Sequence, residues 1–350
     1  MNLKIFVLTF FALLINSLQA QNIDDVKEEE TFYYSYPVKD ITSLSVVNKY
    51  GNINYSGTSR DSIFIEATIR LKNPDNEDIS EIFGMINLNP KLLKQKLEIK
   101  TEFRGSFSSN DEFTVTYMIK GPPQLSLVFN NQFGDIVFES FSGNADITLD
   151  YGNFSAIDPF AKLKIKLKNG KTNLTEIGVV NAELSNAQFF LKKTDHIELK
   201  AEFSNINIGN ASLVNANGQT SEFVFNEVKN LSVSGLQCFV KSSVIKNSGL
   251  FEIQKGSLTV NKILSSTENI SVAVVETPVQ LGLDTKMTYT IHGEISNGNF
   301  EHPEKNRLRM LWEDQTLSFS GEAGKQNSSD SQTEIILFSE KGNIIIKYVE

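Results

Sequence analysis

Carboxylates beside glycine turns are the residues of this chain whose type and spacing come nearest to those of a metal-binding or catalytic site. Asp135, Asp146 and Asp150 are the nearest to a calcium-binding set, but their spacing does not follow the calcium repeat of β-rolls. Two carboxylates that converge across a cleft could instead cleave a glycosidic bond. Asp135 with Asp150 or Asp158 is the first pair to consider for that reaction. We interpret these carboxylates as solvated turn residues and predict no metal site.

The histidines and the single cysteine add no recognisable catalytic set. His196, His292 and His302 each lack a second His or a Cys at metal-ligand spacing. The chain contains no Gly-x-Ser-x-Gly elbow, no Walker-type phosphate loop and no Gly-x-Gly-x-x-Gly sequence after a strand. Cys238 cannot form an internal disulfide, and we expect a buried small hydrophobe rather than a reactive thiol. We therefore predict that the protein is not an enzyme and has no cofactor.

The glycine turns recur at a nearly fixed period between Gln124 and Leu264. Typical examples are Phe133-Gly134-Asp135 and Tyr151-Gly152-Asn153. Equivalent turn positions, which we call anchors, lie 17 or 18 residues apart: Gly134, Gly152, Gly170, Ala187, Ser204, Ser221, Cys238 and Gly256. We expect the anchors to favour Gly, Asn and Asp because a sharp corner often needs a positive φ.

Apolar residues occupy matched columns around these anchors. The positions two and four residues after each anchor, and five residues before it, are apolar except at Thr172 and Ser242. Strand side chains alternate, so the columns at +2 and +4 share one face. A fixed period of about 20 residues is typical of repeat architectures. The pattern predicts an all-β, parallel β-helix-like β-solenoid; the alternative, an antiparallel meander, does not require equal repeats.

The rest of the chain divides into segments of different composition. The N-terminal residues predict a signal peptide over 1–20, with Lys4 before an apolar run and Leu18-Gln19-Ala20 as the cleavage site. An uncleaved anchor is the alternative. Residues 21–30 read as an acidic linker, and residues 31–123 as a β-rich region with a helix near 75–86. The solenoid repeats are expected over 124–264, followed by C-terminal β coils over 265–350 with a flexible loop near 320–333. The N-terminal region and the final strand are expected to cap the stack.

Charge and hydropathy restrict the partners. The 350 residues carry a formal net charge of −9, which argues against nucleic acid and anionic membrane surfaces. Beyond the N-terminal segment no stretch is long and apolar enough for a transmembrane helix. Trp312, the only tryptophan, is a core or capping residue or else a binding aromatic. These features indicate an exported protein of the periplasm or the cell surface.

Several turn motifs resemble one family of exported proteins. The runs Asn48-Lys49-Tyr50-Gly51-Asn52-Ile53, Phe133-Gly134-Asp135-Ile136, Asp150-Tyr151-Gly152-Asn153-Phe154 and Gly342-Asn343-Ile344 are similar to the adhesin-like family of Gram-negative bacteria. The resemblance extends from about Tyr34 to Tyr348. It implies a β-solenoid whose biochemical role is unassigned, and the family has no established catalytic residues to carry over.

Three functional hypotheses follow. The first is a non-enzymatic envelope protein that presents a long β surface to an envelope or extracellular protein, to a glycan, or to its own copies. The second is a polysaccharide-active enzyme on a β-helix scaffold. The third is a periplasmic sensing or assembly accessory.

Overall fold

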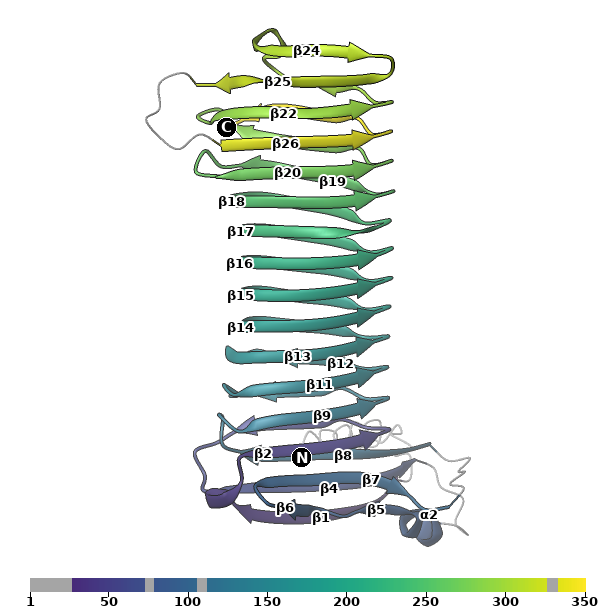
Figure 1. The fold of residues 1–350 in the computed structure, drawn as a ribbon. Coiled ribbons are helices and arrows are strands. Elements are labelled where there is room, and N and C mark those ends of the chain that lie inside the picture. The colour runs from purple at the N-terminus through teal and green to yellow at the C-terminus, as the bar shows by residue number, and fades with distance from the viewer. Residues whose placement is uncertain (1–26, 73–78, 106–111, 326–332) are drawn as a thin grey trace, which may run out of the picture.

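The described part of the chain is almost entirely β-strand. The computed structural model describes residues 27–72, 79–105, 112–325 and 333–350. Within these ranges the strands join into one long, open and mostly parallel sheet, and α2 (Ile79–Met85) is the one α-helix. Figure 1 shows the strands stacked one above another from the N-terminal region to the C-terminal hairpin.

The strands of the N-terminal region are β1 (Lys27–Pro37), β2 (Ser43–Lys49), β3 (Ile53–Gly57), β4 (Ser62–Lys72), β5 (Ile86–Leu88), β6 (Lys91–Leu93), β7 (Lys96–Phe103) and β8 (Glu112–Gly121). The middle contains β9 (Ser126–Gln132), β10 (Ile136–Glu139), β11 (Asn144–Asp150), β12 (Asn153–Ala156), β13 (Phe160–Lys168), β14 (Lys171–Ser185), β15 (Gln188–Glu202), β16 (Asn205–Gln219), β17 (Glu222–Leu236), β18 (Phe239–Gln254) and β19 (Ser257–Ile263). The C-terminal part contains β20 (Asn269–Val275), β21 (Val279–Asp284), β22 (Thr288–Ser296), β23 (Phe300–Glu301), β24 (Leu308–Glu313), β25 (Thr316–Gly324), β26 (Thr333–Glu340) and β27 (Ile344–Val349), with the 3₁₀ turn η2 at Lys305–Arg307.

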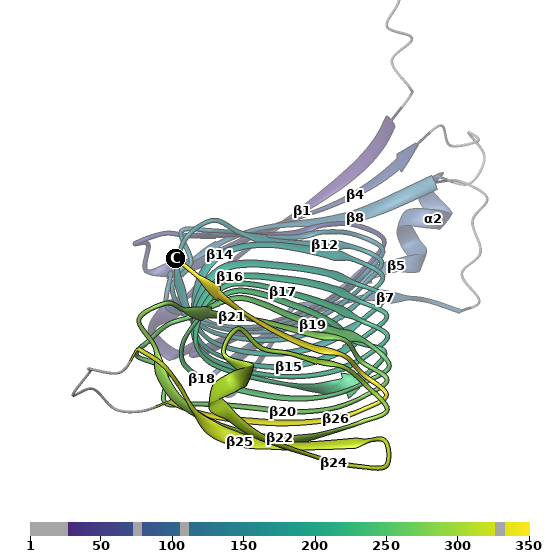
Figure 2. The same cartoon turned by 90° about the horizontal axis from the view of Figure 1, so that it is seen from above.

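Parallel pairing in the middle of the chain keeps a constant register. Ile206 on β16 pairs with Phe189 on β15 and with Phe223 on β17. Each of the long strands β14 to β18 therefore lies beside its own equivalent one repeat away. Seen from above, these strands follow a flattened ring (Figure 2). The front wall, nearest the viewer in Figure 1, is formed by β9, β11, β13, the second halves of β14–β18, β20, β26 and β22. The back wall is formed by β10, β12, the first halves of β14–β18, β19, β21 and β27.

The predicted apolar columns are confirmed as the core. Every position two or four residues after an anchor, and five before it, is buried, including Thr172 and Ser242. Phe129, Phe138 and Phe154 are among the largest fully buried side chains. The outward residues between them are mostly polar, so the pleat separates the two faces as the alternation requires.

The prediction that the anchors themselves have positive φ angles is wrong by one residue. The positive φ angles lie at the preceding residues, such as Phe133 (59°), Tyr151 (54°) and Phe203 (50°). The glycine anchors instead allow the backbones of neighbouring repeats to approach closely, since a Cβ at Gly152 would collide with the carbonyl of Gly134.

Later anchors carry small inward side chains that form hydrogen bonds with backbone groups. The Ser204 hydroxyl accepts the Ala187 amide at 3.1 Å and donates to the Glu202 carbonyl at 2.7 Å. Cys238 occupies the same position and is fully buried, which confirms the expected small buried residue. Burial raises the pKa of its thiol, so the thiolate is disfavoured.

The N-terminal region continues the sheet and then departs from it. β2 and β3 pair in parallel with β9 and β10, so the segment around Gly51 pairs in the same way as the repeats. β1, β4 and β8 form an antiparallel extension that reaches away from the stack in Figure 2. The predicted acidic linker over 21–30 is wrong for its last residues, because Lys27–Glu30 pair with β4 as part of β1. Residues 21–26, and residues 75–78 of the predicted helix, lie outside the described residues.

The C-terminal end has an order that the sequence did not indicate. β26 lies between β20 and β22, and β27 lies between β21 and β23. The last strands are thus inserted into the stack, so the prediction that the final strand caps it is wrong. The antiparallel strands β25 and β24 cover that end instead (Figure 1).

The predicted flexible loop near 320–333 is also wrong over its first residues. Ser320–Gly324 belong to β25, where Phe319 and Ala323 are buried against the core. Pairing on both sides, with β22 and β24, fixes these small residues in spite of their loop-like composition. No helix in the described ranges has both the length and the apolar character needed to span a bilayer.

Candidate functional site

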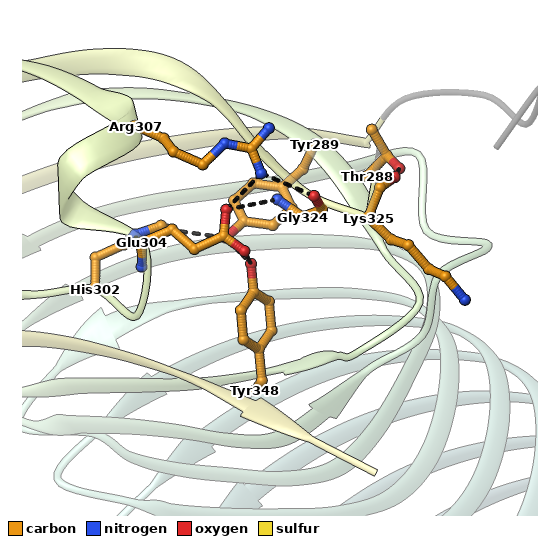
Figure 3. Close-up of polar contacts among 8 residues, drawn as sticks. All are labelled: Thr288, Tyr289, His302, Glu304, Arg307, Gly324, Lys325 and Tyr348. Carbon is orange, nitrogen blue, oxygen red and sulfur yellow. Dashed lines mark hydrogen bonds and ion pairs between the residues drawn. The ribbon is translucent and has the colours of Figure 1, made fainter. Parts of the chain in front are cut away.

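A closed ring of polar side chains lies where the C-terminal strand enters the stack. Tyr289 comes from β22 and Tyr348 from β27, while His302 and Glu304 lie between β23 and η2 (Figure 3). The insertion of β27 beside β23 brings Tyr348 next to residues more than forty positions earlier. Arg307 of η2 completes the cluster.

The directions of the hydrogen bonds are mutually consistent. The Glu304 amide donates to His302 Nδ1 at 3.0 Å, so the neutral imidazole carries its proton on Nε2. His302 Nε2 then donates to the Tyr289 hydroxyl at 2.8 Å, which lies 3.3 Å from the Tyr348 hydroxyl. Tyr348 donates to Glu304 Oε1 at 2.7 Å, and Arg307 donates to Glu304 Oε2 at 2.6 Å.

The surroundings hold each group in one protonation state. Burial lowers the pKa of His302 to about 4 and raises the pKa of Tyr348 to about 12. Burial also raises the pKa of Tyr289 far above its usual value. Burial acts to raise the pKa of Glu304, but hydrogen bonds from Tyr348 and Arg307 outweigh it and the net direction is downward.

This arrangement favours a structural role over proton transfer. Both imidazole nitrogens of His302 and both carboxylate oxygens of Glu304 are occupied by partners within the cluster. The Arg307 guanidinium also donates to the Gly324 carbonyl at 2.9 Å, which ties β25 to the same ring. The ring therefore fastens β27, β22 and the C-terminal hairpin to one another.

We expect acid to weaken this end of the protein. The pKa of His302 is about 4 in the fold and about 6.5 in the unfolded chain, so the unfolded state binds more protons between these values. The contribution of the neutral His302 to the unfolding free energy is about 3 kcal/mol. It is complete above pH 6.5 and is lost as the pH falls through 4. Urea unfolding followed by the fluorescence of Trp312, in β24 at this end, measures the loss between pH 7 and pH 4.

The matched control for this experiment is His302→Gln, which cannot titrate. Its unfolding free energy is expected to fall less steeply over the same interval of pH. The lowered pKa of Glu304 has the same sign but acts below its unfolded pKa of about 4.3, so the window from pH 6.5 to 5 isolates the imidazole. Equal slopes for the two proteins in that window would contradict the assignment.

The carboxylates singled out in the sequence do not converge. Asp135 Oδ1 accepts the amide of Asn153 at 2.8 Å, and Asp150 Oδ1 accepts Asn169 Nδ2 at 3.1 Å, on opposite sides of the sharp corner. Asp158 Oδ2 accepts the Ser140 amide at 2.6 Å, and Asp146 pairs with Lys164 at 3.1 Å. Each carboxylate links neighbouring repeats. In the described residues no group of three or more His, Cys, Asp or Glu side chains could hold a metal ion.

The remaining candidates are dispersed. His196 lies on the front wall with Nε2 2.8 Å from Glu198 Oε1, whereas His292 is half-buried on β22. Trp312 on β24 is 56% exposed, so the core interpretation is wrong and it stands on the edge of the terminal hairpin.

A partly exposed aromatic row is the feature that the anchor analysis missed. Tyr50, Phe133 and Tyr151 each precede an anchor-type glycine, and their rings stack along the sharp corner. The ring centroids are 5.4 Å and 5.1 Å apart, with interplanar angles of 5° and 15°. We call these three residues the corner row. The repeated aromatic before each of these glycines was a visible signal.

Comparison with known proteins gives similarity only at the level of solved structures. No family model matches the chain, and no curated protein matches it. Two structures described as a "putative adhesin", from Parabacteroides merdae and Parabacteroides distasonis, are each 12% identical. They align over 92% and 91% of this chain and 97% of their own length, with TM-scores of 0.33 and 0.35. A "putative lipid binding protein" from Parabacteroides distasonis is 11% identical, with coverages of 92% and 97% and a TM-score of 0.32.

At such identities and TM-scores the role of this chain must be inferred from its own residues.

Proposed function

We propose that this chain is an exported, non-enzymatic, adhesin-like β-solenoid of the cell envelope that presents a rigid binding surface. The corner row is the observation that carries the proposal. Phe133 and Tyr151 are 40% and 52% exposed, although aromatic side chains of this size gain most from burial. Exposed aromatics held in a fixed geometry are typical of surfaces that bind a partner.

The corner row is held in place by the backbone beneath it. Asn52 Oδ1 accepts the amide of Asp135 at 2.8 Å, and Asp135 accepts the amide of Asn153 at 2.8 Å. This chain of contacts sets the spacing of successive corners, and with it the spacing of the rings. A partner that meets the row would find it already ordered and would lose little conformational entropy there.

Cationic and polar groups surround the aromatic rings. Lys49 Nζ lies 4.6 Å from the ring centroid of Tyr50 and 5.9 Å from that of Phe133. Asn52, Asp135 and Asn153 form a parallel polar ladder on the other side of the corner. Rings beside amides, a carboxylate and an ammonium suit a ligand with both apolar and hydroxyl-rich faces, such as a glycan or a protein loop.

The constant register of β14 to β18 supports the solenoid, and the apolar run over residues 5–18 supports export. Protease treatment of intact cells, with a lysed control, tests the compartment. Digestion on intact cells would favour a surface adhesin, whereas protection until lysis would favour a periplasmic sensing or assembly accessory.

The binding surface is tested with glycan and protein panels. We expect Phe133→Ser with Tyr151→Ser to reduce binding by about tenfold or more, because interface aromatics are often worth 2 kcal/mol each. Phe239→Ser is the matched control, since Phe239 is 54% exposed on the back wall, away from the corner row. Equal losses in the two variants would argue against the corner row. Release of reducing ends from a polysaccharide panel would instead favour the enzyme hypothesis.

A further inference from the structure

The outward side chains of the front wall form four straight columns. The register of eight successive strands, in the order β13, β14, β15, β16, β17, β18, β20 and β26, places equivalent residues side by side. The outer columns run from Lys162 to Glu334 and from Lys168 to Glu340. The two ends of this surface therefore carry opposite charges in the same two columns.

The outer lysines and glutamates are available for a partner. Lys162, Lys168 and Glu334 are exposed and form no ion pair within the described ranges. The inner lysines differ, because Lys164 pairs with Asp146 and Lys166 with Glu183. Glu340 contacts Lys341 at 3.5 Å, a pair in which both side chains are more than half exposed. Exposed ion pairs of this kind contribute little and exchange readily.

We propose that two copies of this chain associate through their front walls in an antiparallel dimer. A two-fold axis that lies between the two walls, parallel to the strands and level with the gap between β16 and β17, brings β13 of one copy opposite β26 of the other and keeps each column opposite itself. Lys162 then faces the partner's Glu334, and Lys168 faces the partner's Glu340. By symmetry these two contacts occur twice, which gives four ion pairs at the two ends of the interface.

The two central strands meet without a charge. Asn215 on β16 faces the partner's Ser232 on β17, and Asn217 faces the partner's Ser234. Leu236 and Val179 are 41% and 42% exposed in the single chain, so contact would remove part of their apolar surface from water.

The inner lysines also meet a suitable surface. Lys164 faces the partner's Ile336 and Lys166 faces the partner's Phe338, so their aliphatic stems pack on apolar side chains while their charges stay with Asp146 and Glu183. Phe338 is 45% exposed and lines a hollow in the front wall together with Leu236, Val275 and Glu340.

A further pair of opposite charges meets between the centre and the ends. Lys200 on β15 faces the partner's Glu252 on β18, and both side chains are exposed in the single chain. Glu198 faces the partner's Leu250, and its charge stays with Asn215 Nδ2 at 2.7 Å and His196 at 2.8 Å.

The size of the face suits a stable dimer. Eight strands spaced by about 4.8 Å, each with about seven paired residues at about 3.3 Å, cover roughly 900 Å² per copy. Standard interfaces bury about 800 Å² on each partner. The corner row at Tyr50, Phe133 and Tyr151 lies beyond β13 and stays uncovered, so the dimer is independent of the proposed function and would present two such rows.

The test is a charge exchange followed by sedimentation velocity on the chain lacking residues 1–20. Lys162→Glu with Lys168→Glu is expected to raise the dimer dissociation constant by about tenfold or more, and Glu334→Lys with Glu340→Lys likewise. The four substitutions together restore opposite charges across the axis, so dimerisation should return to near the wild-type level.

Lys171→Glu with Lys241→Glu is the matched control, because both lysines are exposed on the back wall and the change in charge is the same. It is expected to leave the constant unchanged. A monomer at all concentrations would overturn the proposal. So would a dimer that tolerates both double variants, or a fourfold variant that does not recover.

Discussion

Deletion of residues 333–350 is expected to unfold the C-terminal end of the protein and to leave its middle folded. The deletion removes β26 and β27, and with them four fully buried side chains: Ile335, Leu337, Ile344 and Ile346. At about 1.5–3 kcal/mol for each side chain, the lost burial amounts to roughly 6–12 kcal/mol. It also leaves β20 and β22 with unpaired edges on both sides of a gap.

The loss should remain local because each repeat contacts only its neighbours. Hydrogen exchange followed by mass spectrometry should find β22 and β25 unprotected while β14 to β16 keep full protection. Glu334→Ala with Lys347→Ala is the matched control, since these exposed residues lie on the same two strands and their loss should change little. Retained protection of β22 and β25 in the truncated chain would show that the insertion of β26 and β27 is not needed there.

Ile206→Asp is expected to destabilise the middle of the stack by several kcal/mol. Ile206 is 2% exposed on β16 and packs in the column of Phe189 and Phe223. A carboxylate at this position has no ionic partner inside the core, so it would be desolvated without compensation or forced to bind a proton. The midpoint of thermal or urea unfolding measures the effect.

The neighbouring substitution Asn207→Asp introduces the same charge on the same strand, but at an exposed position. We expect it to change the unfolding free energy by no more than about 0.5 kcal/mol. An unchanged midpoint for Ile206→Asp would mean that the column after each anchor does not face the core.

The periodic part of the fold could be predicted because the same pattern of apolar residues recurs in each repeat. Phe154, Phe189 and Phe223 stand at one position relative to their anchors, and all three are buried. Ile63, Ile65 and Ala67 on β4 alternate in the same way, since a strand with one buried face leaves a period of two in the sequence.

The ends of the stack could not be predicted in the same way. The alternation at Ile344 and Ile346 indicates a strand but not its neighbours, and only long-range pairing places β27 between β21 and β23. The ring around His302 follows from that placement, so spacing along the chain gave no sign of it. The corner row was missed because the search centred on the glycine rather than on the residue before it, where the backbone turns to positive φ.

The inserted position of β26 and β27 also determines the order in which the protein can fold. Val279 and Phe300 both pair with Ile344, which is synthesised after them. Until β26 is available, the edges of β20 and β22 that pair with it stay open, whereas the other edge of β20 already pairs with β18. Pairing β27 with β21 closes the long chain segment between them, and this closure costs entropy before the contacts form. We expect the C-terminal end to be the slow phase of refolding, with the middle strands ordered well before it.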